Sequence, residues 1–131
     1  MSWQNAALQI AGLIGATVAV VHGVLVQRLI VAPFATAVPL GAPFSSVVRR
    51  LIPPLIHFST FVWFAGGLAL LLATRFDGST RLWICLLVGA TYLFGAVANF
   101  WATRGAHPGW MLLALALLLI AFGATASSSQ L

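Results

Sequence analysis

The residues best suited to chemistry in this chain are its three histidines, His22, His57 and His107, together with Asn99. A neutral imidazole can ligate a metal, relay a proton or form hydrogen bonds, and a side-chain amide both donates and accepts. Acidic and thiol groups are almost lacking, since the chain has one aspartate or glutamate and one cysteine. No motif specifies a reaction, so catalytic residues stay unassigned and enzymatic activity stays an open question.

Four apolar runs must position these side chains. A helix of about 20 apolar residues crosses a hydrocarbon core of roughly 30 Å, and each run approaches that length. We therefore predict an all-α fold, an integral membrane four-helix antiparallel bundle that forms a single transmembrane domain over residues 1–131. The expected spans are residues 6–28, 51–74, 82–103 and 109–126.

The three connections differ in kind. Residues 75–81 and 104–108 are short and polar, which makes the last three spans antiparallel neighbours. Residues 29–50 form a longer apolar segment with prolines at 33, 39 and 43. Proline breaks a continuous helix, so we expect a long loop between the first two spans that lies in the interface or in space lined by protein.

Composition excludes other classes of protein. Hydrophobic residues make up 62% of the chain and charged residues 5%, and the mean hydropathy is +1.09. Such a surface suits lipid better than water. The net charge of +5 comes from arginines that are scattered at span ends, where cations reach lipid phosphates, so we expect no nucleic-acid partner.

The arginines also predict orientation. The side reached after the first span carries Arg28, Arg49, Arg50 and Arg104, whereas the opposite side carries Arg75 and Arg81. The positive-inside rule then places the first group in the cytoplasm and both termini in the periplasm. Arginine as the sole basic residue besides histidine, with alanine-rich spans, is typical of GC-rich bacterial genomes, so we expect a bacterial inner membrane.

Counting along the helices places the polar residues at one depth. His22 precedes Arg28 by six residues and His57 follows Arg50 by seven, which puts both about 9–11 Å inside the cytoplasmic side at 1.5 Å per residue. Asn99 lies at a similar depth, about 8 Å, and His107 opens the fourth span. Tyr92 and Thr60 share helical faces with this layer. The candidate binding residues are therefore His22, His57, Asn99, Tyr92, His107 and Thr60.

The residue types narrow what such a site holds. Zinc or iron(II) prefers a site with carboxylate or thiolate ligands. Asp77 and Cys85 belong to the membrane side opposite the histidines, so no metal ligands are assigned. Copper on imidazoles stays open. Haem ligated by His22 and His57 requires the first two helices to be splayed or diagonal. A quinone or lipid, held by its polar head, needs only hydrogen-bonding side chains and no metal ligand.

Two other readings stay open. The polar layer can instead join helices by hydrogen bonds, in an accessory or assembly subunit that packs against membrane partners or further copies of itself. A small oligomeric transporter or channel would have to use histidine, because a glutamate within the membrane is absent.

Overall fold

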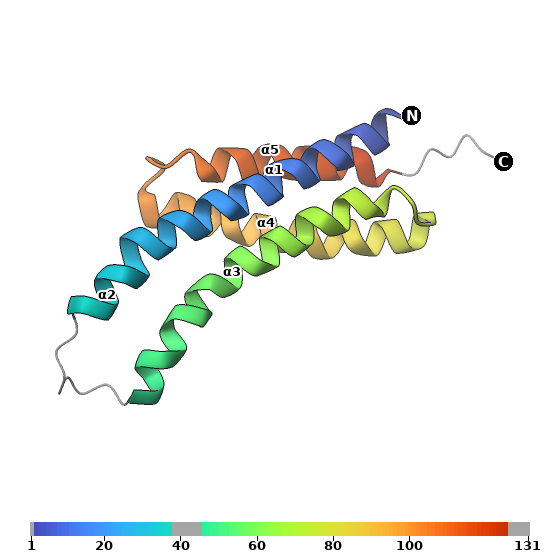
Figure 1. Ribbon diagram of the computed structural model, residues 1–131. Coiled ribbons are helices and arrows are strands. Elements are labelled where there is room, and N and C mark those ends of the chain that lie inside the picture. The colour runs from blue at the N-terminus through green and yellow to red at the C-terminus, as the bar shows by residue number, and fades with distance from the viewer. Residues whose placement is uncertain (1, 38–45, 126–131) are drawn as a thin grey trace.

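The computed structural model describes residues 2–37 and 46–125, and every regular element in these residues is a helix. The all-helical prediction is thus confirmed for this part of the chain. Figure 1 shows the helices lying side by side, with the first three elements forming one continuous rod. In chain order they are α1 (Trp3–Val26), the π-helical turn η1 (Gln27–Val31), α2 (Ala32–Ala37), α3 (Ser46–Ala73), α4 (Gly78–Thr103) and α5 (Gly109–Ala124).

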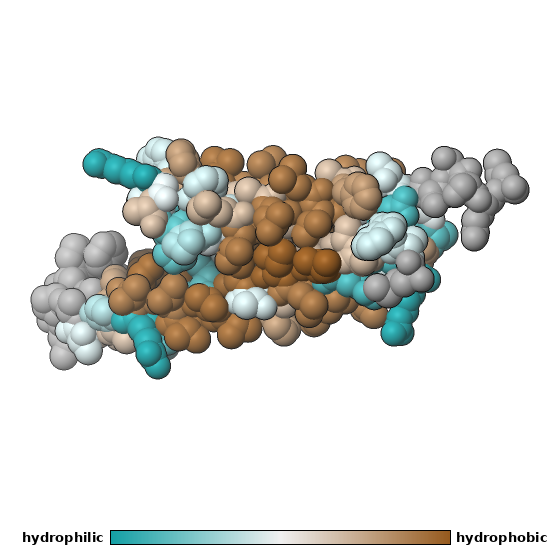
Figure 2. Space-filling view, turned by 90° about the horizontal axis from the view of Figure 1, so that it is seen from above, coloured by the Kyte–Doolittle hydropathy of each residue, from teal (hydrophilic) through white to brown (hydrophobic). Residues whose placement is uncertain are grey.

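Three helical segments are long and apolar enough to span a membrane: Trp3–Thr36, Ser46–Ala73 and Gly78–Thr103. The fourth apolar helix, α5, has 16 residues, which gives a length of about 24 Å. Figure 2 shows hydrophobic side chains over the middle of the molecule and hydrophilic ones towards its two ends. This distribution fits a multi-pass membrane protein.

The helix ends follow from ordinary capping chemistry. The Ser2 hydroxyl accepts a hydrogen bond from the Asn5 N–H at the start of α1, and the Asp77 carboxylate accepts one from the Thr80 N–H, at 2.7 Å, at the start of α4. Both are preferred N-cap residues because they satisfy a backbone donor that lacks a partner within the helix. At the other end of α4, Arg104 and Gly105 adopt positive φ, which turns the chain towards α5.

The connection between the first two spans differs from the predicted loop. The first helix does not end near residue 28 but continues through η1 and α2 to Ala37, and α3 already begins at Ser46. The π turn ends two residues before Pro33, where a regular helix would need the missing N–H and would clash with the carbonyl one turn back. Pro53 and Pro54 likewise lie inside α3. Pro39 and Pro43 fall outside the described residues.

Helix α1 packs against α3 and α5, and α4 packs against the same two helices. The first two spans are therefore neighbours. Their closest approach uses glycine on both sides, since a Cβ on Gly12 would lie 2.6 Å from the Gly67 carbonyl oxygen, and the converse distance is the same. Small residues of this kind let membrane helices approach closely. Leu8, Leu70, Tyr92 and Leu113 fill the centre and are fully buried.

One arginine ties three helices together at the end of the molecule that carries the chain termini. Arg81 in α4 donates through Nε and Nη2 to the Gly123 carbonyl of α5, at 3.1 and 2.6 Å, and through Nη1 to Asn5 Oδ1 of α1, at 2.7 Å. The carbonyls of the last helical turn lack partners within the helix, and a guanidinium is suited to satisfying them. Arg81 is thus a structural clamp as well as a cation at a span end.

Candidate functional site

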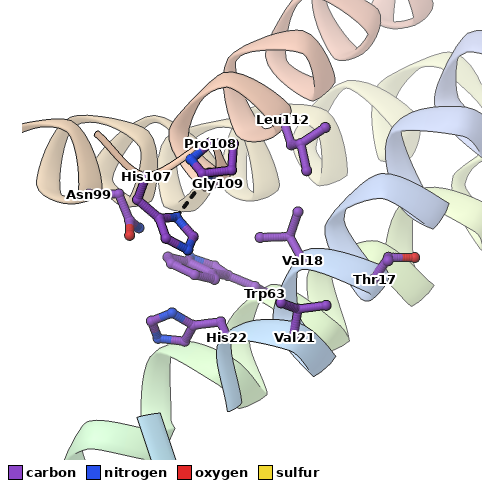
Figure 3. A pocket seen from close by; sticks show the side chains of 10 residues that line it. All are labelled: Thr17, Val18, Val21, His22, Trp63, Asn99, His107, Pro108, Gly109 and Leu112. Atoms are coloured by element: carbon purple, nitrogen blue, oxygen red, sulfur yellow. Dashed lines mark hydrogen bonds between the residues drawn. The ribbon is translucent and has the colours of Figure 1, made fainter. Parts of the chain in front are cut away.

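A cavity of about 150 Å³ lies at the end of the bundle where α4 turns into α5, opposite the Arg81 clamp. Figure 3 shows side chains from all four packed helices converging on it. Most of its wall is apolar, and none of the lining residues carries a permanent charge. The lining residues are Thr17, Val18, Val21 and His22 from α1, Trp63 from α3, Asn99 from α4, and His107, Pro108, Gly109 and Leu112 from the turn and α5.

His22 is held from two sides by α3. Its imidazole packs on the Trp63 indole, with centroids 4.7 Å apart, and its Nε2 lies 3.2 Å from Ser59 Oγ. The Ser59 hydroxyl also lies 3.2 Å from the Ile56 carbonyl, and when it donates its proton there, the proton between His22 and Ser59 belongs to Nε2. A neutral imidazole with Nε2 protonated keeps Nδ1 as an acceptor. His22 therefore offers the cavity an acceptor.

His107 has the opposite arrangement. Its Nδ1 accepts a hydrogen bond of 3.0 Å from the backbone N–H of Gly109, drawn as the dashed line in Figure 3. The neutral ring must then carry its proton on Nε2, which is a donor. Glycine at 109 permits this turn, because a Cβ there would come within 2.9 Å of Nδ1. The two histidines thus present complementary groups, an acceptor from α1 and a donor from the α4–α5 turn.

Asn99 and Trp63 complete the polar lining. Asn99 Nδ2 donates to the Gly95 carbonyl at 2.9 Å, which leaves Oδ1 and the second N–H unused by other described residues. Trp63 is 5% exposed, and Gly95 lets its indole lie directly on the α4 backbone, where any Cβ would overlap the ring. No described residue accepts a hydrogen bond from the indole N–H.

The other three predicted residues do not line this cavity. His57 Nε2 lies 2.9 Å from Gln27 Oε1, which joins α3 to η1. Tyr92 is fully buried and donates to the Trp63 carbonyl at 3.3 Å. Thr60 places its methyl group against Gly23, and its buried hydroxyl has no hydrogen-bond partner among the described residues. Of the six candidates, the structure brings together His22, Asn99 and His107.

Two functional neighbours were missing from the sequence-based set. Ser59 fixes the tautomer of His22, and Trp63 forms a wall of the cavity. A signal for Trp63 exists in the sequence, because this tryptophan lies near the middle of its span, away from the interfacial level that indoles prefer. Nothing in the sequence distinguishes Ser59 from the other hydroxyl residues that pair with their own helix.

The arrangement does not suit a metal or haem. No group of three histidine, cysteine, aspartate or glutamate side chains comes together within residues 2–37 and 46–125. The pairs His22–Ser59 and His57–Gln27 connect α1 and η1 directly to α3. A haem plane with a ligand on each side needs those helices apart, so His22 and His57 do not frame a haem site.

Comparisons with protein families, curated proteins and solved structures find no match to this chain. The geometry of the cavity is therefore the basis for assigning a function.

Proposed function

We propose that this is a four-span protein of the bacterial inner membrane that binds the polar ring of a hydrophobic small molecule, of the quinone or phenol type, between His22, Asn99 and His107. Both termini face the periplasm, and the cavity lies near the cytoplasmic side. The observation that carries the proposal is the complementary pair of histidines on a small cavity. Each has one ring nitrogen held by the protein, and the other is unused by any described residue.

The size of the cavity supports a single ring. An apolar protein cavity of about 150 Å³ is large enough to admit benzene, and this cavity has about the same volume. A porphyrin is several times larger. The ring of a quinone or phenol places one or two oxygens at its edge, which is the number of polar groups that the lining histidines can satisfy.

The polarity of the lining supports a neutral ligand. A quinone carbonyl would accept from His107 Nε2, and a hydroxyl of the reduced ring would donate to His22 Nδ1. Asn99 adds an amide oxygen and an N–H. A phospholipid head would instead seek arginine or lysine for its phosphate, and neither type is among the described residues that line the cavity.

Orientation rests on the arginines. Arg28 in η1, Arg49 and Arg50 in the first turns of α3, and Arg104 at the end of α4 lie at the end of the molecule nearest the cavity. An excess of arginine marks the cytoplasmic side. The ring site would then be reached from the cytoplasmic leaflet.

Thermal unfolding of the detergent-purified protein with trimethyl-para-benzoquinone tests the proposal. A ligand that binds the folded state at 100 times its Kd stabilises it by about 2.7 kcal/mol, so the melting temperature should rise. His22→Phe keeps a ring against Trp63 but removes both nitrogens, and His107→Phe does the same in the turn. The quinone form of the ring only accepts hydrogen bonds, so His107→Phe should weaken its binding about three- to tenfold, as expected for one lost hydrogen bond. His22→Phe should cause the same loss for the reduced form, trimethylhydroquinone, whose hydroxyl donates to Nδ1.

His57→Phe is the matched control, because His57 bonds Gln27 away from the cavity. It should leave the quinone-induced shift unchanged. The proposal fails if trimethyl-para-benzoquinone produces no shift in the wild type, or if all three histidine variants reduce the shift equally.

A role as a subunit of a larger membrane complex is the second candidate. The rod formed by α1, η1 and α2 and the first turns of α3 extend beyond α4 and α5 in Figure 1. They expose large apolar side chains there, including Leu29, Leu51 and Leu55. Copurification of a stoichiometric membrane partner, lost when Leu51 and Leu55 are changed to serine, would support this role.

A further inference from the structure

A second hollow lies beside the cavity, along the seam between α1 and α5. This groove has a volume of about 230 Å³ and is lined by Leu13, Ile14, Thr17, Val18 and Leu112. Thr17, Val18 and Leu112 also line the cavity. The two hollows therefore adjoin along a shared wall, and we refer to the second as the α1–α5 groove.

The groove runs from the histidines towards the middle of the membrane. Leu13 precedes His22 by nine residues in α1, which corresponds to about 13 Å along the helix axis. The groove also opens to the side, since Leu13 is 58% exposed and Leu112 is 43% exposed. A molecule in the lipid could enter it between α1 and α5 without passing through water.

The hollow between α3 and α4 offers a comparison. It is larger, about 330 Å³, and is lined by apolar residues that include Phe58, Ala90 and Phe94. It shares only Trp63 with the cavity, whereas the α1–α5 groove shares three lining residues. The α1–α5 groove is therefore the nearer hollow for a chain attached to a ring in the cavity.

We infer that the ligand is a ring that carries an apolar tail, such as a prenylated quinone, with its ring in the cavity and its tail in the α1–α5 groove. This inference rests on the proposed function. The arrangement matches the way an amphiphile lies in a leaflet, with the polar group near the interface and the tail towards the centre. The wall that the two hollows share gives the tail its route, and the lateral opening between α1 and α5 is the route of entry.

The test compares two probes, trimethyl-para-benzoquinone and the same ring with one prenyl unit on its one unsubstituted carbon. In the wild type the tail should raise affinity about tenfold, equivalent to about 1.4 kcal/mol. Leu13→Trp fills the groove far from the ring, so it should remove this gain and leave binding of the tail-less probe unchanged. Ala90→Trp places the same side chain in the hollow between α3 and α4 and should keep the gain.

Leu13 and Ala90 are both exposed in the structure, so both variants should fold. Measuring all proteins in one detergent cancels the preference of the tail for the micelle. A second measurement uses the wild type alone: a prenyl tail that ends in a diazirine should label α1 and α5 around Leu13 and Leu112.

The outcomes separate the two claims. If neither probe binds the wild type, the proposed function itself falls. If both probes bind but the gain survives in Leu13→Trp, or the diazirine labels α3 and α4, the tail route is overturned while the ring site stands.

Discussion

The imidazole of His22 packs on the indole of Trp63 at a tilt of 53°. The same indole lies on the α4 backbone at Gly95, and the carbonyl of Trp63 accepts a hydrogen bond from Tyr92. Tyr92 in turn occupies the space that Gly15 leaves open in α1. The position of the His22 ring is therefore set by a continuous set of contacts that runs from α1 through α3 to α4 and back.

Gly15→Ala should destabilise the protein. The added Cβ would overlap the Tyr92 hydroxyl, and overpacking of this kind costs about 1–3 kcal/mol. Tyr92→Phe removes that hydroxyl, so the double variant should recover part of the loss in a thermal or denaturant unfolding experiment. Gly89→Ala is the control, because its nearest neighbours lie 3.9 Å away. Equal losses in Gly15→Ala and Gly89→Ala would contradict this packing.

Arg81→Gln should weaken the packing of α1, α4 and α5 and lower the melting temperature. It removes hydrogen bonds to Gly123 and Asn5, and each bond to a charged group contributes about 1.5–3 kcal/mol where it is protected from water. Since Arg81 is only part-buried, we expect a total near the lower figure. Arg75→Gln, at an exposed position of the turn before α4, should have little effect on the melting temperature. Equal effects would show that Arg81 acts only as a surface cation.

Asp77 should give the stability a pH dependence at the acidic end. Hydrogen bonds from Thr80 lower the pKa of the Asp77 carboxyl below its ordinary value of 3.8. A lowered folded-state pKa means that the stabilisation is present above the unfolded-state value and is lost as the pH falls through the folded value. Asp77→Ala should therefore be less stable than the wild type at neutral pH, and the difference should shrink on acidification.

Asp77→Asn separates capping from titration. Asparagine also caps helices well but has no proton to bind, so this variant should stay near wild-type stability at neutral pH without the acidic dependence. A difference between the wild type and Asp77→Ala that is constant from neutral pH to pH below 3.8 would contradict the assignment.

Reporter fusions should establish the orientation. A reporter joined after Ser79, in the first turn of α4, should be active in the periplasm, and one joined after Arg104 should be active in the cytoplasm. Orientation depends on the difference in arginine number between the two sides. Replacing Arg49 and Arg50 with glutamine should therefore raise the share of inverted molecules. The reverse pattern in the unmodified protein would place the cavity on the periplasmic side.

Depth along a helix could be read from the sequence, but rotation about its axis could not. Counting residues grouped His22, His57, Asn99 and His107 in one layer, and the structure brings three of them to one cavity. His57 lies on a different side of α3 and pairs with Gln27. The rotation depends on how Gly12 and Gly67 interlock, which no pattern within one helix specifies.

Two predictions based on neighbouring residues in the sequence missed what the surrounding structure adds. Pro33 predicted the end of a helix, but a π turn before it accommodates the ring and the rod continues to Ala37. Arg81 was read as a cation at a span end, and its bonds to α5 depend on a carbonyl 42 residues further along the chain. The helical character of the runs was predictable because it needs only composition and length.

The unequal lengths of the rod and of α5 mean that the protein presents an uneven hydrophobic thickness to the lipid around it. The segment Trp3–Thr36 of the rod has 34 residues and measures about 51 Å, and α5 measures about 24 Å. In the proposed four-span arrangement, lipid beside α5 would thin, and the rod would tilt or extend past the headgroups, at a cost of a fraction of a kcal/mol for each ångström of mismatch. The tilt and the stability of this protein should therefore depend on bilayer thickness, most strongly along the side where α1 packs against α5.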